Sequence, residues 1–552
     1  MDLIYCSDPS LAGEITGVLA EQPTAKPVTH KATGPWGAFV ATDTPYWGYA
    51  PSVVDNDLFC ILGDPLTSKV PVRGHGGAER TLGVARKWTA DPSSVEPDHP
   101  AALIRARASR SVDIVTDAWG AVSLFYGVFE GDLYLATSPD LIALCVRTEV
   151  DPLSAQEFLA TTQLSFPNTL YKGIKQVAPA SHVTLTPNGL ESSVQYWTAP
   201  LPLPDKTPEE WASRLQKSVT RTFKRIRTEL GNKGTSTLSA GLDTRFLVAM
   251  ATREKLLDVD AITVTPIRNQ EFWIAKRAAH AMGVPHTCVS PPRGAYGERM
   301  VRNAPVIPSH MDRDHAHFTD QVLGEVTSPF LLGGYMADTI LHFANPFYTM
   351  RRHAVRLGRI PADAPRWALT TFSTTLDSET ADAISRRWQQ SDALLGITAD
   401  HEQSLVTAYP AARQAHIAHF QAAHREYPIY EPFMTRSALA LGFKIPIRMK
   451  EKTRKDVFYS PYLDGLSSGM LVAGGSNVIT KRVETRLKDV PPDKRPEWTK
   501  LNSAWYSTQG PSNEEYKRCL TASRGRTKKQ FSGDYTSVSA QLCFQIARAL
   551  DT

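Results

Sequence analysis

Cysteine is scarce in this chain of 552 residues and is spread over its whole length. No CxxC pair is present, which argues against a secreted disulfide scaffold and against a zinc site of that type. No run approaches the roughly 18 consecutive apolar residues of a membrane span. The first residues also lack the basic segment and long apolar stretch of a secretory signal. These absences predict a reduced, cytoplasmic protein with no membrane partner.

An excess of charge of one sign is also missing. The chain has 61 Lys+Arg against 56 Asp+Glu, a net charge of +5. That is too little to predict nucleic-acid binding, which needs a concentrated basic face. The 42% of hydrophobic residues excludes a wholly disordered or collagen-like chain. At about 150 residues per domain, the length favours two to four domains.

The distribution of turn residues divides the chain into a front half and a back half. Residues 1–200 are typical of short strands and turns, and include a hairpin around Glu130-Gly131-Asp132. A proline-rich linker follows at 199–205. Strands and helices then alternate, which favours a parallel sheet covered by helices. The fold class is therefore α+β or all-β in front and α/β behind. The expected elements of the back half are a helix at 209–230, strand at 235–238, helix at 244–255, strand at 261–265 and helix at 271–282.

One loop has the pattern of a phosphate site. A β-branched strand leads into Ser239-Ala240-Gly241, and an amphipathic helix follows directly. The unpaired N–H groups at such a helix start attract anions. Asp243 would repel a phosphate unless it held a cation, so it points to Mg²⁺-nucleotide. An ordinary strand-to-helix turn is the alternative. No GxxxxGK[ST] occurs, and Gly74-His75-Gly76-Gly77 lacks the third glycine of a dinucleotide fingerprint.

Leu238-Ser239-Ala240-Gly241-Leu242-Asp243-Thr244 resembles the SGGxDS pyrophosphate loop of the asparagine synthetase superfamily. Ala240 and Thr244 are departures from that motif. The resemblance extends over roughly residues 110–460 through four more segments. These are Asp117-Ala118-Trp119-Gly120, Leu170-Tyr171-Lys172-Gly173-Ile174, Gly283-Val284-Pro285-His286 and Leu331-Leu332-Gly333-Gly334-Tyr335-Met336-Ala337-Asp338.

The resemblance implies a division into domains. It predicts a degenerate N-terminal nucleophile-hydrolase-like, glutaminase-like domain at 1–198 and a linker at 199–208. An adenine-nucleotide α-hydrolase (pyrophosphate-loop) synthetase domain would follow at 209–480, then a basic C-terminal extension at 481–552. In the segment that ends at Asp338, an apolar strand is followed by two glycines that permit close backbone approach.

ATP and Mg²⁺ are the expected ligands. Asp243 and Asp338 would hold Mg²⁺, although a helix N-cap is an alternative role for Asp338. The residues expected to contact the nucleotide are Leu238, Ser239, Ala240, Gly241, Leu242, Asp243, Thr244, Val264, Gly333 and Gly334.

The resemblance also suggests two catalytic residues. Asparagine synthetases usually carry a glutamate at the position of Tyr335, whereas β-lactam synthetase and its carbapenam relative carry a tyrosine that deprotonates the attacking amine with help from a glutamate. Glu379 is one candidate helper, and a core aromatic is the alternative role for Tyr335. Glu431-Pro432-Phe433 and Lys450-Glu451-Lys452-Thr453-Arg454 resemble the family's closing segment. Within it, Lys450 resembles the lysine that stabilises the acyl-adenylate, with Lys452 in reserve. A solvated basic face is the alternative there.

Glutaminase activity is not expected. Glutamine-dependent relatives use an N-terminal cysteine, whereas this chain begins Met1-Asp2 and its first cysteine, Cys6, fits a small buried hydrophobe. The segment from His310 to His317 contains His and Asp without ligand spacing, and we expect a polar loop there.

These features predict an ATP-dependent amide-bond-forming ligase of the ring-closing type, making a β-lactam or a lasso-peptide macrolactam. A divergent ammonia-dependent asparagine synthetase is the alternative. A tRNA thiolase-like enzyme or a non-catalytic nucleotide-binding protein are alternatives of other classes. The expected partners are a small-molecule or peptide carboxylate substrate, and a precursor peptide with its processing protease.

Overall fold

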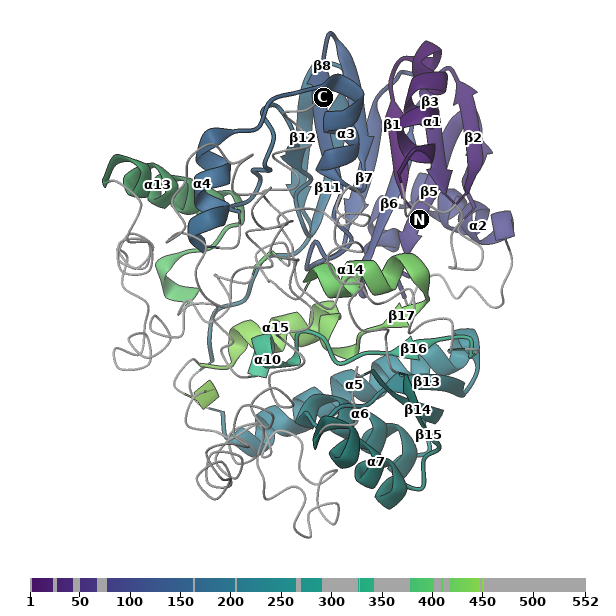
Figure 1. Cartoon of the computed structure of the whole chain (residues 1–552), viewed down its shortest axis with the longest axis vertical. Helices are drawn as coiled ribbons and strands as arrows, with labels where there is room; N and C mark the ends of the chain where they lie inside the picture. The colour runs from purple at the N-terminus through teal and green to yellow at the C-terminus, as the bar shows by residue number, and fades with distance from the viewer. Residues whose placement is uncertain are drawn as a thin grey trace, which may run out of the picture.

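The computed structural model contains two antiparallel sheets and one parallel sheet (Figure 1). It describes residues 2–22, 27–42, 50–66, 77–161, 164–203, 206–264, 270–289, 326, 328–341, 378–401, 409–410, 417–446 and 449–450. The mixed α/β class expected from the sequence is confirmed. Among the described helices, none is long and apolar enough to cross a membrane.

Both antiparallel sheets have six strands and are built from residues 3–195. The first sheet has the order β10-β8-β9-β1-β3-β2 and the second β12-β11-β7-β6-β5-β4. The strands of the first sheet are β1 (Leu3–Cys6), β2 (Val28–Gly34), β3 (Gly37–Thr42), β8 (Phe125–Phe129), β9 (Asp132–Ala136) and β10 (Lys175–Gln176). Those of the second are β4 (Ser52–Val54), β5 (Asp57–Gly63), β6 (Ala101–Ala106), β7 (Val112–Thr116), β11 (Ser181–Thr186) and β12 (Gly189–Gln195).

Side-chain alternation along β1 explains how the layers stack. Leu3 and Tyr5 pack into the core between the two sheets, whereas Ile4 and Cys6 face the other way, toward helices. Those helices are α1 (Ala12–Ala20) and α3 (Pro139–Val146), while α2 (Gly77–Ala90) covers the outer face of the second sheet. We call this helix–sheet–sheet–helix assembly the front unit.

The parallel sheet has five strands in the order β15-β14-β13-β16-β17, and every pairing in it is parallel. We call this sheet and its helices the back unit. The strands are β13 (Lys233–Thr237), β14 (Asp258–Val264), β15 (His286–Val289), β16 (Leu331–Leu332) and β17 (Ile429–Tyr430). The helices are α5 (Pro208–Leu230), α6 (Leu242–Arg253), α7 (Gln270–Met282), α10 (Ala337–Leu341), α13 (Ser378–Leu394), α14 (Ile417–Glu426) and α15 (Arg436–Lys444).

The strand order puts a switch point between β13 and β16. From β13 the chain adds β14 and β15 on one side, and it later adds β16 and β17 on the other. In open parallel sheets, ligands bind beyond the carboxyl ends of the strands at such a point. Leu238 and Gly333 are the first residues beyond these two strand ends.

Element boundaries in the back unit differ from the prediction by a few residues. The strands expected at 235–238 and 261–265 begin earlier, at Lys233 and Asp258. Helix α6 begins at Leu242, two residues before the expected start, because Gly241 is extended and acts as its N-cap. The segment 310–317, residues 361–377 and the extension 481–552 lie outside the described residues.

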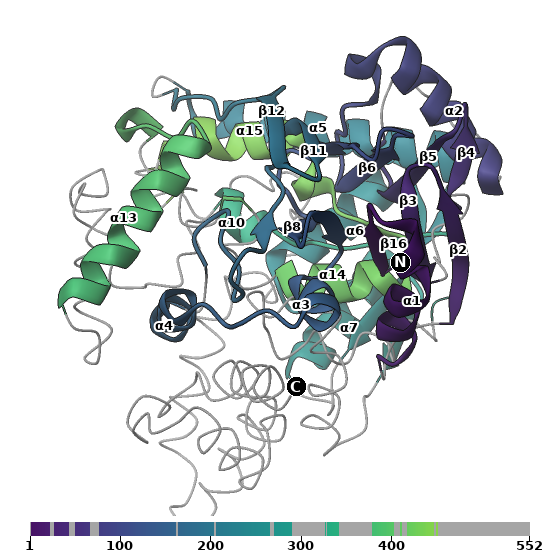
Figure 2. The same ribbon diagram turned by 90° about the horizontal axis from the view of Figure 1, so that it is seen from above.

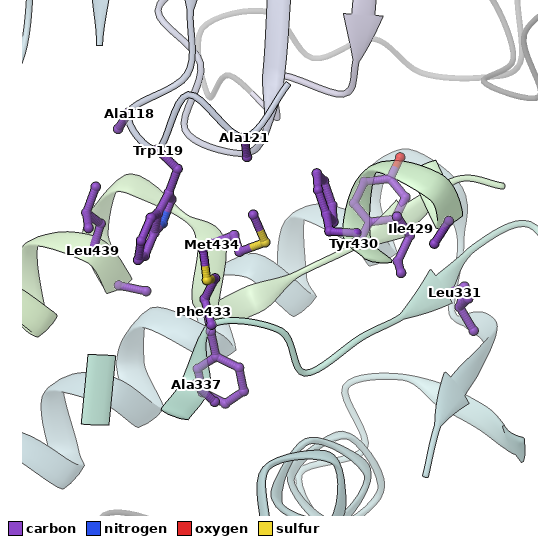
Figure 3. Packing of buried hydrophobic residues seen from close by; sticks show 14 of the residues in the cluster. Ala118, Trp119, Ala121, Leu331, Ala337, Ile429, Tyr430, Phe433, Met434 and Leu439 are labelled. Carbon is purple, nitrogen blue, oxygen red and sulfur yellow. The ribbon is translucent and has the colours of Figure 1, made fainter. Parts of the chain in front are cut away.

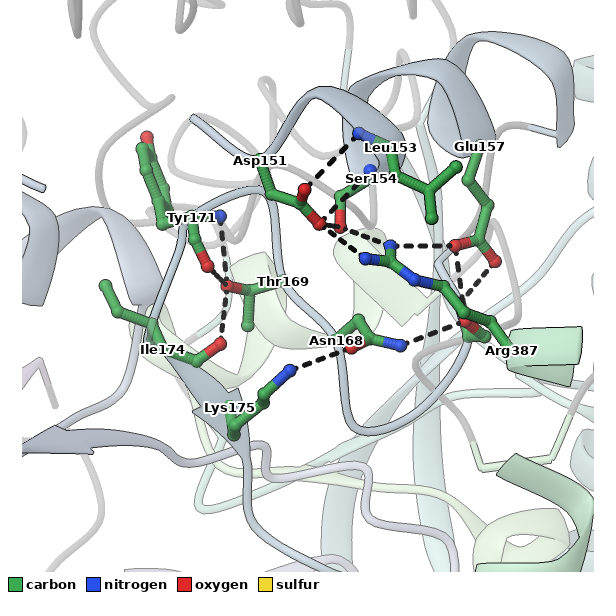
Figure 4. A network of polar contacts seen from close by, with 11 residues as sticks. Asp151, Leu153, Ser154, Glu157, Asn168, Thr169, Tyr171, Ile174, Lys175 and Arg387 are labelled. Atoms are coloured by element: carbon green, nitrogen blue, oxygen red, sulfur yellow. Dashed lines mark hydrogen bonds and ion pairs between the residues drawn. The ribbon is translucent and has the colours of Figure 1, made fainter. Parts of the chain in front are cut away.

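A continuous apolar core joins the two units. Trp119, in the loop after β7, is fully buried in the same cluster as Met434 and Leu439 of the back unit (Figure 3). A polar network reinforces the join on another side, where Arg387 of α13 donates to Asp151 (Figure 4). Figure 2 shows α13 near α4 (Pro152–Thr161), and the two helices are in contact.

Candidate active site

The first residue of the predicted phosphate loop is tied to the neighbouring strand. The Leu238 N–H donates to the Ile262 carbonyl at 2.8 Å, and the Thr263 hydroxyl donates to the Leu238 carbonyl at 2.6 Å. Leu238 itself is buried. The two hydrogen bonds therefore fix where the loop leaves β13. Thr263 takes part in this, although no motif in the sequence marks it.

Hydrogen bonds between Ser239 and Thr244 connect the two ends of the loop. The Ser239 N–H donates to Thr244 Oγ1 at 3.0 Å, the two hydroxyls lie 3.0 Å apart, and the Gly241 N–H donates to Ser239 Oγ at 3.0 Å. Gly241 caps α6 without any side-chain hydrogen bond. The first turn of α6 therefore lacks a side-chain cap, and its positive end is suited to an anion.

Arg245 holds the loop from the inner side. Its Nε donates to the Gly241 carbonyl and its Nη2 to the Ala240 carbonyl, both at 2.9 Å. Burial lowers the pKa of Arg245 to about 10. The guanidinium thus binds two carbonyls of the loop and places a positive charge next to the loop. Sequence reasoning missed this role, because an arginine in the first turn of a helix carries no distinguishing spacing.

The second predicted motif lies directly against this loop. The Thr237 hydroxyl donates to the Leu332 carbonyl at 3.2 Å. A Cβ on Gly334 would lie 3.1 Å from Thr244 Cγ2 and 3.6 Å from Asp243 Cβ. A larger residue at Gly334 would therefore press on the start of α6. Gly334 therefore permits the close approach expected of it, and what it approaches is the loop that begins α6.

The two predicted metal ligands lie at helix starts. Asp243 is half-buried in the first turn of α6. Asp338 is the second residue of α10, and its side chain lies outside the part that the structure describes. Two residues before Asp338, Met336 has a left-handed backbone conformation with φ of 67°, which is uncommon for a non-glycine residue. Within the described residues, no group of three or more His, Cys, Asp or Glu could hold a metal ion.

Glu431 lies beside Tyr335. The Tyr335 N–H donates to Glu431 Oε2 at 2.9 Å, and Glu431 is fully buried. A Cβ on Gly333 would lie only 1.7 Å from Glu431 Oε1, so the carboxyl group occupies the space that this glycine leaves free. Among the described residues, Glu431 Oε1 has no hydrogen-bond partner.

Burial sets the acid–base properties of this pair. It raises the pKa of Glu431 well above 4.5, against the opposing effect of the Tyr335 N–H. Burial, and then the charge of the Glu431 carboxylate, raise the pKa of Tyr335 well above 10. The Tyr335 ring packs edge-on against Phe420, with the ring centres 6.5 Å apart. A phenolate beside a carboxylate is disfavoured, so the two groups do not readily carry a negative charge at the same time.

The acid beside Tyr335 differs from the candidate named from the sequence. Glu379 is an exposed side chain in the first turn of α13. Glu431 was expected only as part of the closing segment, and it lies 96 residues from Tyr335. No local pattern connects two positions so far apart; the parallel pairing of β16 with β17 brings them together.

Lys450 is buried, and its Nζ donates to the Gly442 carbonyl at 2.6 Å. Gly442 belongs to α15, which packs on α10, the helix that contains Asp338. A buried lysine with this bond does not fit a solvated basic face. Lys452 and Arg454 lie outside the described residues. Val264 ends β14 as a half-buried residue, and the five residues after it are outside the description as well.

Cys6, the first cysteine of the chain, does not have the surroundings of a nucleophile. Cys6 is fully buried in β1, and burial raises the pKa of its thiol to about 11. This agrees with the expected small buried hydrophobe. Cys288, in β15, is half-buried and pairs in register with Thr263. A reactive thiol needs a lowered pKa, so Cys6 lacks the chemistry of a nucleophile.

No protein-family model matches the chain. No curated protein matches it either. Among solved structures, similarity is found to an allosteric regulatory enzyme of purine biosynthesis, with a TM-score of 0.25 and 9% identity over 53% of this chain and 82% of that one. The glutamine phosphoribosylpyrophosphate amidotransferase from B. subtilis, complexed with ADP and GMP, gives 0.25 and 10% over 52% and 65%. The U34-tRNA thiolase NcsA from Methanococcus maripaludis, with its [4Fe-4S] cluster, gives 0.20 and 12% over 38% and 80%. Similarities this low assign neither a family nor a function, so the functional argument comes from the residues of the site.

Proposed function

We propose that the protein is an ATP-dependent ligase that adenylates a substrate carboxylate, releases pyrophosphate and lets an amine displace AMP. One observation carries this proposal: the two motif loops meet at the switch point of the parallel sheet, with Gly334 against Thr244 and Asp243. Ligand sites of open parallel sheets occur at this position. This arrangement supports a nucleotide site formed by the loop at 238–244 together with the segment that ends at Asp338.

The α6 end of the site fits the pyrophosphate part of ATP. Gly241 leaves the helix start without a side-chain cap, and Arg245 adds a buried positive charge below the loop. A carboxylate at Asp243 fits a Mg²⁺ site, because this ion is commonly held by one or two carboxylates together with phosphate oxygens and water. Asp243 and Asp338 would hold Mg²⁺, which would neutralise charge on the departing pyrophosphate.

Tyr335 and Glu431 fit the second half-reaction. A new C–N bond forms at the acyl carbon while the bond from that carbon to the AMP oxygen breaks, and AMP leaves with the electron pair. The amine must lose a proton, and the Tyr335–Glu431 pair would accept it. Because burial raises the pKa of Glu431, its carboxylate holds a proton more tightly than an exposed one.

The nitrogen donor in this proposal is an amine rather than glutamine, because the Cys6 thiol is buried with a raised pKa. Ring closure, giving a β-lactam or a macrolactam, places carboxylate and amine on one small molecule or one precursor peptide. Addition of free ammonia, as in an asparagine synthetase, is the alternative within the class. Ring closure needs no added amine, so this difference is easy to measure.

The test is ATP–pyrophosphate exchange with amino acids, β-amino acids and precursor peptides as carboxylates. We expect exchange with at least one of them, and a loss on the order of a hundredfold in Asp243→Asn, which removes a transition-state charge contact. Asp260→Asn is the matched control, since Asp260 is an exposed carboxylate on β14 of the same sheet. Exchange at the wild-type rate in Asp243→Asn, or none with any carboxylate, would overturn the proposal.

A further inference from the structure

The N–H group of Glu431 points away from the parallel sheet. Glu431 follows β17, which is the last of the described strands on its side of the sheet and pairs among them with β16 alone. The Tyr430 carbonyl accepts from the Gly333 N–H, so the neighbouring N–H, on Glu431, faces outward. A strand neighbour cannot satisfy it there. A buried N–H in this position needs some other acceptor.

That acceptor comes from the front unit. The Glu431 N–H donates to His99 Nε2 at 3.0 Å across 332 residues of sequence. Since Nε2 accepts, the proton of the neutral ring must be on Nδ1, which lies 3.0 Å from the Asp64 carbonyl and donates to it. His99 is 2% exposed, and burial lowers its pKa to about 4. The imidazole therefore stays neutral, in this one tautomer, at physiological pH.

Asp64 and Tyr430 fix the position of this imidazole. The Tyr430 hydroxyl donates to Asp64 Oδ2 at 2.6 Å, and the His99 ring stacks on the Tyr430 ring with centres 5.2 Å apart. Asp64 thus contacts the back unit through its side chain and His99 through its backbone. This contact is shielded from solvent, since Asp64, His99, Tyr430 and Glu431 are all buried.

We propose that His99 is a positioning residue: it links the front unit to the Glu431 backbone and so holds the Glu431 carboxyl group against Gly333 and the Tyr335 N–H. This inference rests on the proposed function for its catalytic consequence, although the linkage itself is independent of it. In this proposal the front unit contributes to the synthetase reaction by positioning Glu431, without any glutaminase chemistry. The amine-activating pair is complete only when the two units are docked.

Two substitutions of His99 separate its two hydrogen bonds. His99→Asn keeps a donor near the Asp64 carbonyl and cannot reach the Glu431 N–H. His99→Gln places an amide oxygen near the position of Nε2 and can accept from Glu431. His182→Asn is the matched control, because His182 is a half-buried histidine of the front unit whose near neighbours are Glu96 and Tyr196.

The first readout compares the two half-reactions on the full chain. The carboxylate is the one that supports exchange in wild type, and the added amine is ammonium or hydroxylamine. For His99→Asn we expect pyrophosphate exchange to be retained and amide formation from ammonium to fall about tenfold to a hundredfold, the cost of a misplaced catalytic group. Hydroxylamine, which is largely unprotonated at neutral pH, should be affected less. His99→Gln should recover most of the loss, and His182→Asn should match wild type.

The second readout needs no substrate. Urea unfolding is followed from pH 5 to pH 8 in wild type, His99→Asn, Glu431→Gln and the double variant. The titratable groups facing this region are Asp64, Asp98, Tyr335 and His424. Loss of the His99 imidazole removes its own contribution to the pH dependence below about pH 6.5 in both backgrounds, because burial lowers its pKa to about 4. If His99 positions Glu431, His99→Asn should in addition change the pH dependence of the urea midpoint between pH 7 and pH 8 in the wild-type background and not in the Glu431→Gln background.

The outcomes are distinct. An equal change between pH 7 and pH 8 in both backgrounds, or equal amide formation in His99→Asn and His99→Gln, would overturn the inference and leave His99 as an ordinary core histidine. If wild type exchanges with no carboxylate, the proposed function fails, and the unfolding comparison still decides on His99. Should His99→Asn not fold, His99→Gln carries the test: a pH dependence between pH 7 and pH 8 like that of wild type supports the inference, and a changed one contradicts it.

Discussion

Arg425 of α14 donates two parallel hydrogen bonds to Asp2, the residue just before β1. Its Nε lies 2.7 Å from Asp2 Oδ1, and its Nη2 lies 2.6 Å from Oδ2. The side chains are only 11% and 3% exposed. The Asp2 N–H also donates to Thr42 Oγ1 at 2.9 Å. A fully formed ion pair thus joins the front unit to the helix before β17.

We expect Asp2→Asn or Arg425→Met alone to lower the free energy of unfolding by about 3–5 kcal/mol, because each removes one charge of a buried ion pair. The double variant should recover much of this loss. Urea unfolding measures it. The matched control is the exposed pair Lys172–Glu149, 2.6 Å apart, whose removal should hardly move the urea midpoint. Additive losses at Asp2 and Arg425 would contradict the prediction.

Arg245 should control nucleotide binding. Arg245→Lys cannot reach the carbonyls of both Ala240 and Gly241, because lysine has a single nitrogen where the guanidinium uses two. We expect the KM for ATP in the exchange assay to rise about tenfold, corresponding to roughly 1.4 kcal/mol. Arg253→Lys, at the exposed end of the same helix, is the control. An unchanged KM would mean that the loop keeps its shape without this contact.

The local parts of the fold could be read from the sequence. The hairpin expected at Glu130-Gly131-Asp132 is present, and both Glu130 and Gly131 take positive φ values, 52° and 88°, as a tight two-residue turn requires. The periodic helix expected at 209–230 is α5, which begins with a capping box between Thr207 and Glu210. These features depend on neighbours in sequence, so their patterns are visible there.

The contacts that complete the site could not be predicted in this way. His99 and Glu431 are far apart in the chain, and each lies in a loop beside a proline, with no periodicity around it. The Asp2–Arg425 pair spans 423 residues. Polar contacts of this kind depend on how the two units dock. Such contacts produce no periodic pattern in the sequence of either segment. The two motif loops were identified because each is a local strand–loop–helix pattern.

Glu431→Gln should stabilise the protein at neutral pH. Burial raises the folded-state pKa of Glu431 above its unfolded value of about 4.3, so its favourable contribution is complete below that value and is lost as pH rises through the folded pKa. Glutamine cannot ionise and keeps an oxygen for the Tyr335 N–H. We expect a gain of about 1–3 kcal/mol at neutral pH that shrinks toward pH 4. A gain independent of pH would show that ionisation of Glu431 is not its source.

Tyr335→Phe tests the second half-reaction. Adenylation requires the groups around the α6 loop, whereas amine attack requires a group that takes up a proton. Tyr335→Phe should therefore keep ATP–pyrophosphate exchange and lose amide product by on the order of a hundredfold or more. Its effect on folding should be small, because the bond to Glu431 comes from the backbone N–H, which phenylalanine retains. Exchange and product are measured on one preparation across pH. If both fall together, Tyr335 acts in nucleotide binding or packing against Phe420. If neither falls, the phenol takes no part in proton transfer, and Glu431 alone would have to accept the proton.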